Sequence, residues 1–600
     1  MLIKSLNTGV ILEHSPEQEV TFTIDNPIFE DDRLPVAVST GIEFPPTPIN
    51  KVEFGFVEAM LLAPTVQKLP VAFIVAGIEI FTGELQFDEY SDGTLKYTFV
   101  GVGADKILPG KIYEVPSSTY DGIEMKEFIK NARKEYYQDF KLPQIIRQPN
   151  SAKVEYATDT AAADCSIIDK YVNYLYSDLP YLVPVVSVQW LLGKIIPGVP
   201  FSPGPDFIMA KLGVVAPYKP ASWNNDYFGV PYTSHDAHDP TTGRYRINKI
   251  SDFRPTEGLP DISNREFLSN LLKMFCATMF IDGNSYRIIE NIGIIDSTDF
   301  VDWTDKVAEL YSVVAGEESG YSLAYANENS NYTPSKVDDL GQAEIDPAIT
   351  TCDNYYQMID KFRVAANYIN VQIASTRNIY SGKQIKARLY YHYEGRKGVV
   401  YNTHVTLIPT MDIVYQAGIE KKVVNKKSDD FKMYENNIGF QCVKCVPAAV
   451  ATPIREGTTD SQVTMYNLSP VIEFPTVGAE RPTSVYIGLV YGTNMLDQGN
   501  YFSNGMPYVS AGLEDPQKYS LAIVGEKGLY ELYHKKFAEW LIKKKDTIKA
   551  DIFLSPADVA GLRLWQKVMI YNRVFIIKTI EITISDNTDI VFANAEFIEV

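Results

Sequence analysis

At 600 residues the chain is too long for one hydrophobic core, and its length predicts about three to five domains. Its 46% hydrophobic and 22% charged residues are typical of a globular protein rather than a disordered one. The formal net charge of −20 argues against non-specific attraction to nucleic acid or to an acidic membrane. A negatively charged surface is compatible, however, with a channel wall that DNA passes without adhering.

The cysteines and the start of the chain indicate the compartment. Five cysteines in 600 residues do not make a disulfide framework. Cys442 and Cys445 form a CVKC pair, but a structural zinc site commonly takes two such pairs, so we interpret them as ordinary half-buried cysteines of a strand. MLIKSLNTGV has no long apolar core, and the apolar stretch from Tyr181 is shorter than the roughly 20 residues of a membrane span. We therefore expect a soluble protein from a reducing compartment, with no signal peptide and no membrane span.

Residues 1–105 are predicted to form an N-terminal β-barrel or sandwich domain. In EVTFTID, Val20, Phe22 and Ile24 share one face of a strand. A hairpin follows in GELQFDEYSDGTLKYTF, where an Asp-Gly turn separates two runs of alternating polar and apolar residues.

One stretch of this domain, GIEFPPTPINKVEFGF at 41–56, fits neither regular structure. By our reasoning its three prolines exclude both a strand and a helix, yet it is too apolar for a solvated loop. We predict a rigid crossover in which Asn50 turns the chain into the next strand. Phe44, Phe54 and Phe56 would anchor it to the core or to a neighbouring subunit.

Residues 106–260 are interpreted as a helical and Pro-rich domain. Asp121 stands at a capping position before apolar residues at helical spacing, which predicts a helix over 122–138. A second helix is expected over 166–177. Prolines recur so often between 180 and 240 that we expect loops and short elements laid over other structure there.

Residues 261–350 predict a compact helix–hairpin module. Ser263 and Glu266 form a capping box before an apolar-periodic helix. In MFIDGNSYRII the residues Asp-Gly-Asn turn one strand into another, and FVDWTDKV closes the unit. The polar residues 315–350 are expected to form a long surface loop.

Strand patterns dominate 351–525, which we interpret as a second β domain. In 526–600 an amphipathic helix begins after Lys527, Ser555 and Pro556 begin a short helix, and a hairpin and a last strand follow. This C-terminal helix–strand–hairpin unit can complete an earlier β domain. The predicted fold class is therefore mixed α+β and mainly β, with several β-barrel or sandwich domains and inserted helix–hairpin modules.

A motif for catalysis or cofactor binding is hard to find. GKIIPGVPFSPGPDF lacks the Gly-Lys-Ser/Thr ending of a phosphate-binding loop, and neither GxSxG nor HExxH occurs. TSHDAHDP at 233–240 is the best metal candidate, because His235, Asp236, His238 and Asp239 are ligand types that zinc accepts. It precedes a turn, so we prefer to interpret it as a solvated turn with polar tips.

The remaining reactive or charged residues also favour structural roles. Cys276 lies among apolar residues with no histidine nearby in sequence, which is typical of a buried structural thiol rather than a nucleophile. KKKDTIK at 543–549 is the one real basic cluster, and it ends an amphipathic helix, where cations suit the helix dipole. We assign no catalytic, cofactor-binding or metal-binding residue, and expect an assembly component rather than an enzyme.

Three groups of stretches resemble tail proteins encoded by phages and prophages of Bacteroidetes-type hosts. The N-terminal group is IDNPIFEDD, FPPTPINKVEFGF and the hairpin that contains Gly-Glu-Leu. The central group is FLSNLLKMFCATMFIDGNSYRII and VDWTDKV. The C-terminal group is GLYELYHKKFAEWL and IKADIFLSPADVAGLRLWQKVMIYNRVFIIKTIEITI. The stretches follow the family's order.

This resemblance implies a tail hub or baseplate protein, a structural virion protein of the phage tail. Its β-barrel domains would form a ring, as a homo-oligomer that we expect to be a trimer. The ring would connect the tail tube or distal tail ring to a spike or fibres, as part of the apparatus for host attachment. Genomic DNA would pass through it during ejection without specific binding. The chain would be made in the bacterial host cytoplasm and reside in the virion.

Two other functions stay open. The many tyrosines could stack on sugars, which would suit a host-surface glycan-binding adhesin. A tail-borne cell-wall hydrolase or peptidase is the other, and His235 and His238 would then be the residues to test.

Overall fold

The computed structural model describes the chain mainly in its two terminal parts and its centre. Described in full are residues 1–35, 39–55, 66, 68–91, 93–101, 107–123, 127–128, 131–132, 137–143, 183–203, 207–218, 220, 250, 252–283, 285–325, 421–428, 431–441, 480–490, 521, 523, 526–585 and 590–600, apart from a few side chains within strands. Elsewhere only the backbone course of several strands is given. These parts form several β-sheets with short helices between them, which confirms the predicted mixed, mainly β fold class.

The N-terminal sheet has six strands in the order β2-β1-β5-β6-β7-β4. Alternating apolar residues give its strands one buried face and one exposed face. The predicted hairpin is confirmed, because Ser91 pairs with Thr94 across the turn and Gly93 has a φ of +74°. The strands are β1 (Leu2–Ser5), β2 (Ile11–Leu12), β4 (Ser39–Phe44), β5 (Lys68–Val75), β6 (Ile78–Ser91) and β7 (Thr94–Gly101).

The C-terminal sheet combines strands from both ends and from the middle of the chain. Its order is β15-β30-β31-β32-β29-β16, and β3 pairs with β31 beside β30. The β3–β31 pairing is antiparallel and runs from Val20↔Ile584 to Asp25↔Thr579. The strands are β3 (Val20–Asp25), β15 (Phe300–Asp302), β16 (Val307–Val314), β29 (Thr547–Leu554), β30 (Lys567–Ile570), β31 (Arg573–Ile584) and β32 (Val591–Glu599).

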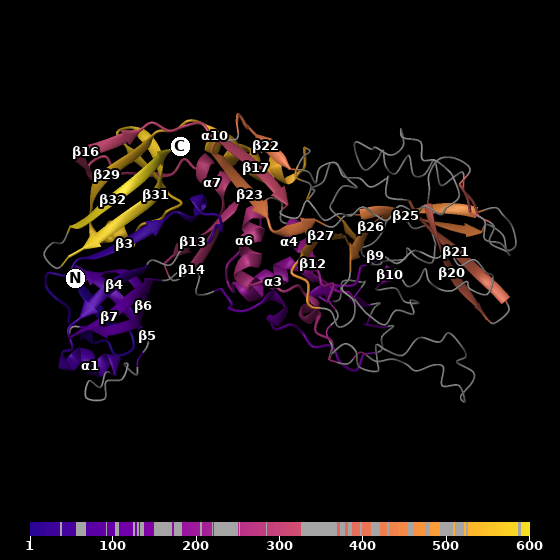
Figure 1. The fold of residues 1–600 in the computed structure, drawn as a ribbon, viewed down its shortest axis with the longest axis horizontal. Coiled ribbons are helices and arrows are strands. Elements are labelled where there is room, and N and C mark those ends of the chain that lie inside the picture. Colours follow the sequence, from indigo (N-terminus) through magenta and orange to yellow (C-terminus); the bar gives the residue numbers. More distant parts are fainter. Residues whose placement is uncertain are drawn as a thin grey trace.

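The two sheets pack on one hydrophobic core, so the two ends of the chain fold together (Figure 1). Phe22 of β3 lies at its centre, with ring centroids 5.1 Å from Phe73 and 5.6 Å from Phe99 of the N-terminal sheet. Ile580 and Ile582 of β31, the strand that pairs with β3, contribute to the same core. The five domain boundaries stay predictions, but residues 1–101 and 547–600 are not separate in their cores.

The C-terminal sheet curls into a half-barrel. Its two edge strands, β15 and β16, are separated by only four residues, 303–306, so the edges of the sheet must approach each other. The backbone N–H of Trp303 donates to the Met569 carbonyl of β30 at 2.9 Å. The N–H of Phe553 in β29 donates to the Lys306 carbonyl at 3.0 Å. The buried Trp303 ring fills the interior beside Phe597.

The stretch 41–56 contradicts our prediction of a crossover without regular structure, because it contains helix α1 (Pro48–Phe54). Thr47 is the N-cap, Pro48 stands in the first turn where its missing N–H costs nothing, and Gly55 ends the helix at a φ of +60°. Asn50 is buried, and its amide donates to the carbonyls of Glu13 and Pro45 rather than turning the chain.

The phenylalanines of this stretch do anchor it to the core. Phe44 and Phe54 are fully buried, and the Phe54 ring stacks on Tyr97 with centroids 4.2 Å apart. Phe56 lies outside the described residues.

The predicted helix–hairpin module forms as expected in its first half. Ser263 caps α6 (Asn264–Met274) by accepting from the Glu266 N–H at 3.1 Å. The hairpin is β13 (Ala277–Asp282) and β14 (Ser285–Glu290), followed by α7 (Asn291–Asp296). The predicted polar loop over 315–350 is wrong at its start, because residues 320–325 form the buried strand β17 (Gly320–Tyr325). The rest of that stretch lies outside the described residues.

Strand β17 is the centre of a three-stranded sheet, between β22 (Lys422–Val424) and β23 (Met433–Ile438). The predicted C-terminal helix packs near it, as a π-helical turn η9 (Tyr530–His534) that continues into α10 (Lys535–Ile542). All six residues of β17 are buried, and Gly320, Ser322 and Ala324 among them are small. A strand of this composition has no apolar alternation, so the sequence pattern does not reveal it.

A further sheet has the order β24-β27-β12-β11-β8, with β28 on β27. Its strands are β8 (Phe140–Lys141), β11 (Val185–Ser187), β12 (Leu212–Val215), β24 (Phe440–Cys442), β27 (Val485–Tyr491) and β28 (Tyr508–Ser510), and α3 (Val188–Ile195) and α4 (Phe207–Lys211) lie beside it. The described part of the Pro-rich region, residues 183–203, 207–218 and 220, thus contains short elements as predicted, and many of their residues are buried. The residues from 221 to 240 lie outside the described ranges.

The outermost sheet in the order β10-β9-β26-β25-β21-β20 is given by its backbone alone. It consists of β9 (Ile145–Gln148), β10 (Tyr171–Val172), β20 (Ala387–Arg396), β21 (Val399–Pro409), β25 (Cys445–Pro453) and β26 (Ser461–Glu473), and β18 (Ile369–Val371) pairs with β19 (Ile379–Ser381) elsewhere. Strand β10 contradicts the predicted helix over 166–177. Of the predicted helix over 122–138, the described residues 127–128 and 131–132 are helical, whereas 122–123 and 137–138 are not, so the prediction is wrong at its two ends.

We expect Phe22→Ala to destabilise the fold by about 3–5 kcal/mol, because it removes the ring on which both sheets pack. Urea unfolding followed by far-UV circular dichroism measures the change. The matched control Leu6→Ala removes an apolar side chain that is 48% exposed and should cost less than about 0.5 kcal/mol. Equal losses in the two variants would show that the sheets do not share this core.

Candidate functional site

Strand β16 carries an uncovered group of apolar side chains at one end of the half-barrel. Tyr311, Val313 and Val314 are 47%, 50% and 49% exposed, and Tyr571 beside them is 48% exposed. We call these four residues the rim, in which Val314 follows Val313 directly and therefore lies on the opposite face of β16. Tyr311 and Val313 pair with the buried Ala550 and Ile548, so they face the interior side of the sheet where the half-barrel is open.

The turn between β30 and β31 holds Tyr571 in the rim. Tyr571 and Asn572 both have positive φ values, 48° and 61°, as a two-residue hairpin turn of type I′ requires. A bulky residue is uncommon there and costs backbone energy, since Asn and Gly are the favoured residues. The turn brings the Tyr571 ring to a centroid distance of 5.9 Å from Tyr311.

A charged cluster lies next to the rim. Arg573 donates from Nε and Nη2 to the two oxygens of Glu599 at 2.9 and 2.6 Å, and from Nη2 to Asp546 at 3.1 Å. The hydrogen bonds to Glu599 and then to Asp546 raise the pKa of Arg573. This fork-shaped pairing ties the end of β32 to the start of β31 and fixes the backbone from which the Tyr571 turn projects.

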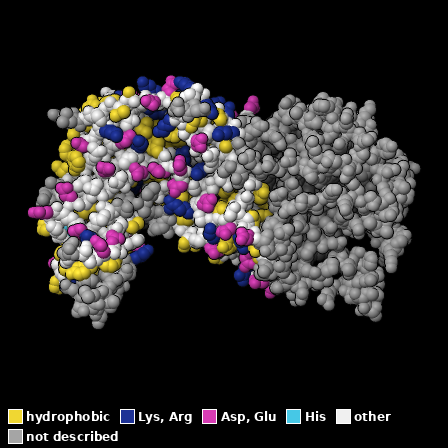
Figure 2. Space-filling view, in the orientation of Figure 1, with side chains coloured by type: hydrophobic (Ala, Val, Ile, Leu, Met, Phe, Trp, Pro, Cys, Tyr) yellow, Lys and Arg dark blue, Asp and Glu magenta, His cyan; other side chains and the backbone are white. Residues whose placement is uncertain are grey.

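Two lysine-rich segments meet beside the rim. The backbone N–H of Ser319 donates to the Ile542 carbonyl at 3.2 Å, and the Asn425 amide donates to the Ser319 carbonyl at 2.9 Å. Each partner of Ser319 is followed directly by a lysine, Ile542 by Lys543 and Asn425 by Lys426. We call the exposed lysines Lys421, Lys426, Lys427, Lys543 and Lys544 the basic face. Figure 2 shows Lys and Arg side chains gathered along the upper edge of the molecule, over α10 and β22.

Lys545 belongs to the same run but has a different role. Its ammonium group donates to the carbonyls of Trp540 and Lys543 and lies 4.4 Å from the Trp540 ring centroid. It therefore caps the C-terminus of α10. Burial lowers its pKa to about 8.

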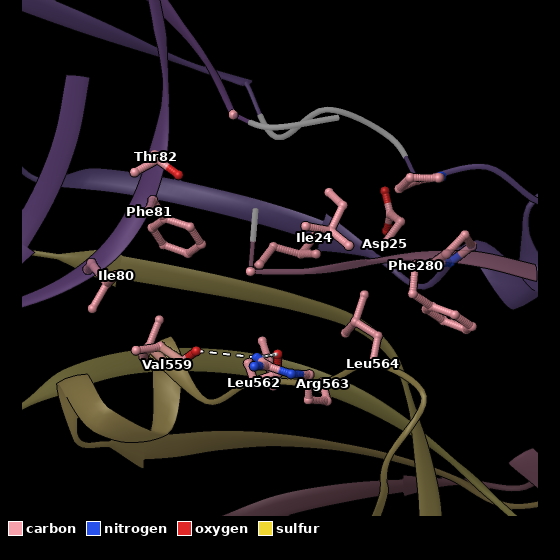
Figure 3. Close-up of a pocket in the computed structure, with 16 residues that line it drawn as sticks. Ile24, Asp25, Ile80, Phe81, Thr82, Phe280, Val559, Leu562, Arg563 and Leu564 are labelled. Carbon is pink, nitrogen blue, oxygen red and sulfur yellow. Dashed lines mark hydrogen bonds between the residues drawn. The ribbon is translucent and has the colours of Figure 1, made fainter. Parts of the chain in front are cut away.

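A cavity of about 180 Å³ lies where β3, β6, the β13–β14 turn and the segment after α11 (Pro556–Ala560) meet (Figure 3). Its two ionisable lining residues are engaged: Asp25 accepts from the Thr579 hydroxyl at 2.9 Å, and Arg563 pairs with Asp282 at 3.0 Å. Most of the lining is apolar, so the cavity suits an apolar group rather than a charged substrate. It includes Ile24, Ile80, Phe81, Phe280, Val559, Leu562 and Leu564.

A buried histidine joins three elements of the central module. His534 Nε2 lies 3.0 Å from the Met274 carbonyl, which can only accept, so Nε2 carries the proton. Nδ1 therefore accepts from the Tyr321 hydroxyl, at 2.7 Å. Burial lowers the pKa of His534 to about 3, so the ring is neutral and its hydrogen bonds are structural. The π-helical turn η9 sets the position of this side chain.

The remaining sequence candidates separate into described and undescribed residues. Cys276 lies after α6 rather than within it, at a φ of 48°, and burial raises the pKa of its thiol to about 12. Cys442 and Cys445 lie in different strands, β24 and β25, with side chains outside the described part. TSHDAHDP at 233–240 also lies outside it. Within the described ranges no three His, Cys, Asp or Glu side chains could share a metal ion.

Within the described ranges, none of the helices combines the length and the apolar character that crossing a membrane requires.

Comparison with known proteins gives little beyond the fold description above. No family model and no curated protein matches the sequence. Among the solved structures that match, two that align over nearly the whole chain are described as tail proteins. The 43 kDa tail protein of prophage MuSo2 from Shewanella oneidensis is 8% identical, covers 99% of this chain and 97% of its own, and has a TM-score of 0.29. The tail protein from Neisseria meningitidis MC58 is 7% identical, with 100% and 95% covered and a TM-score of 0.30. TM-scores this low do not establish a common fold.

We expect the stability of the chain to depend on pH through His534. Its pKa is lower in the folded chain than the usual 6.5, so the unfolded chain binds the proton more readily. The stabilisation of the fold by the neutral His534 is complete above the pKa that this histidine has in the unfolded chain. It is lost as the pH falls below that pKa, by about 1.4 kcal/mol per pH unit. His534→Gln cannot titrate and should show a smaller slope between about pH 6.5 and 5 in urea unfolding. Parallel slopes for both proteins would contradict a buried neutral His534.

Proposed function

We propose that this chain is a structural subunit of a phage or prophage tail, at the hub or baseplate, where copies of it form a ring. The observation that carries the proposal is the rim. Strand β16 is an edge strand of the half-barrel, and its Tyr311, Val313 and Val314 are about half exposed. A native protein usually blunts or covers such an edge, so an apolar edge strand calls for a partner.

The resemblance stated above supports the proposal through the residues that it involves. IDNPIFEDD contains Ile24 and Asp25 of β3 and the turn after them, FPPTPINKVEFGF contains α1, and the C-terminal stretch contains the β30–β31 hairpin. These segments lie far apart in sequence, yet each contributes side chains to the one core between the two sheets or packs against it. The stretches that resemble tail proteins therefore help to build the unit that carries the rim.

The charge of the chain supports a passage for DNA through such a ring. A formal net charge of −20 repels the phosphate backbone, which allows a genome to slide past without being held. We propose that the ring joins the tail tube or distal tail ring to a spike or fibres, and that it is a trimer. The proposal assigns no enzymatic step, no cofactor and no metal to the chain.

We expect the double variant Tyr311→Ser with Val313→Ser to lower incorporation of the chain into tails by at least about tenfold, because buried aromatic anchors carry much of an interface's binding energy. Tail particles purified from the bacterium that carries the gene would be analysed by quantitative mass spectrometry. The matched control Phe553→Ser changes a side chain of the same sheet that is 50% exposed.

Two results would contradict the proposal in different ways. If the wild-type chain is absent from the tail particles, the tail function itself is wrong. If the wild-type chain is present and the rim variant is incorporated as well as the control, the chain is a tail protein but the rim is not an assembly surface.

A further inference from the structure

The end of the N-terminal sheet that carries α1 has an uncovered apolar surface of its own. Ile49 and Val52 stand three residues apart, on one face of α1, and are 42% and 78% exposed. The same helix buries Asn50 and Phe54 on its opposite face. We call the outer side of α1 with Ile49 and Val52 the α1 face.

This face is bordered by negative charge. The Glu13 backbone exchanges two hydrogen bonds with the Asn50 amide, at 3.0 and 2.7 Å, so the exposed segment from Glu13 to Glu19 passes beside α1. Glu17 and Glu19 in that segment are exposed too. Residues 1–101 as a whole contain fifteen acidic residues against five basic ones. The α1 face is thus an apolar surface with an acidic border.

The rim has exposed lysines on one side. Val314 pairs with Thr547, so the chain that leads into β29 brings Lys543 and Lys544 next to the rim. Lys426 and Lys427 approach them through the contacts of Ser319, but Lys427 is paired within the chain with Glu318, so Lys543 and Lys544 are the cations that we assign to the contact. The residues 421–428 contain four lysines and no acidic residue, although the chain as a whole is strongly acidic.

From this match we propose that the α1 face of one copy docks on the rim and basic face of the next copy. The apolar parts meet at the centre, and the glutamates and lysines pair around them, which is how protein interfaces combine affinity with specificity. The inference names the partner surface of the ring under Proposed function and therefore rests on it in part. Its chemistry, however, requires only that copies of the chain associate.

Two observations favour a second copy over DNA as the occupant of the basic face. The lysines border apolar and aromatic side chains, which a phosphate backbone does not need, and the rest of the chain repels DNA. In addition, α1 and β16 lie at opposite ends of the double-sheet unit (Figure 1). Contact between two different ends is head-to-tail, and such contacts close into rings when the rotation allows.

The test reverses the charges at each end separately and then together. The rim variant is Lys543→Glu with Lys544→Glu, the α1 variant is Glu13→Lys with Glu17→Lys, and the third protein carries all four changes. Association of each full-length chain is measured by sedimentation velocity at low ionic strength, where surface charges act most strongly. The thermal unfolding midpoint of each variant is compared with wild type to exclude loss of folding.

We expect each two-residue variant to associate at least about tenfold more weakly than wild type, because like charges then face each other. The four-residue variant should recover association, since its reversed ends match again. As a control, Lys194→Glu reverses the charge of a lysine on α3, an element that belongs to neither surface. This variant should sediment as wild type.

The inference is overturned if wild type is monomeric, if both two-residue variants associate as wild type, or if the four-residue variant fails to recover. It is also overturned if the rim variant loses affinity for a fluorescent 20-base-pair DNA duplex while its self-association is unchanged, because the basic face would then be a DNA surface. Presence of the chain in tails despite such a result would refute the docking and leave the tail function intact.

Discussion

The antiparallel register between residues 20–25 and 579–584 connects the two ends of this chain, and the rest of the structure depends on it. Phe22 projects from this pairing into the N-terminal sheet, while Ile580 and Ile582 project from its partner strand into the same core. Since a one-residue slip would turn every one of these side chains to the other face, the register is strongly specified by burial. The apolar face of each sheet is covered by the other sheet.

The positions of the rim and of the α1 face follow from how the strands are arranged around that core. β31 is long enough to hold β3 along its second half and β30 along its first, and the sheet curls because β15 and β16 are joined by only four residues. The curl leaves one end open, where the Tyr571 turn and β16 form the rim. At the other end of the unit, the buried Asn50 holds α1 against the Glu13 segment, with Ile49 and Val52 facing outwards. The apolar cavity behind Arg563 lies between these parts and has no reactive pair in its lining.

Local patterns in the sequence were sufficient for elements whose signal is local. Ser263, Ser555 and the turn at Gly93 each act through residues two or three positions away, and the sequence predicts the helix or hairpin at each of them. The prediction that the stretch 41–56 has no regular structure is wrong because it treats every proline as a helix breaker. Pro48 stands at the first helical position, where proline fits. Strand β17 was missed because its small and polar residues are buried by long-range partners, β22 and β23, which no local pattern reveals.

The rim and the α1 face could not be predicted as surfaces, because Tyr311 and Ile49 look like ordinary core residues until the fold leaves them uncovered. The most direct measurement of the central claim is an electron-microscopy reconstruction of the assembly that the purified chain forms. We predict a closed ring with a central opening, in which the α1 face of each subunit covers the rim of its neighbour. Particles without an opening, or a ring in which the rim of each subunit stays uncovered, would contradict it.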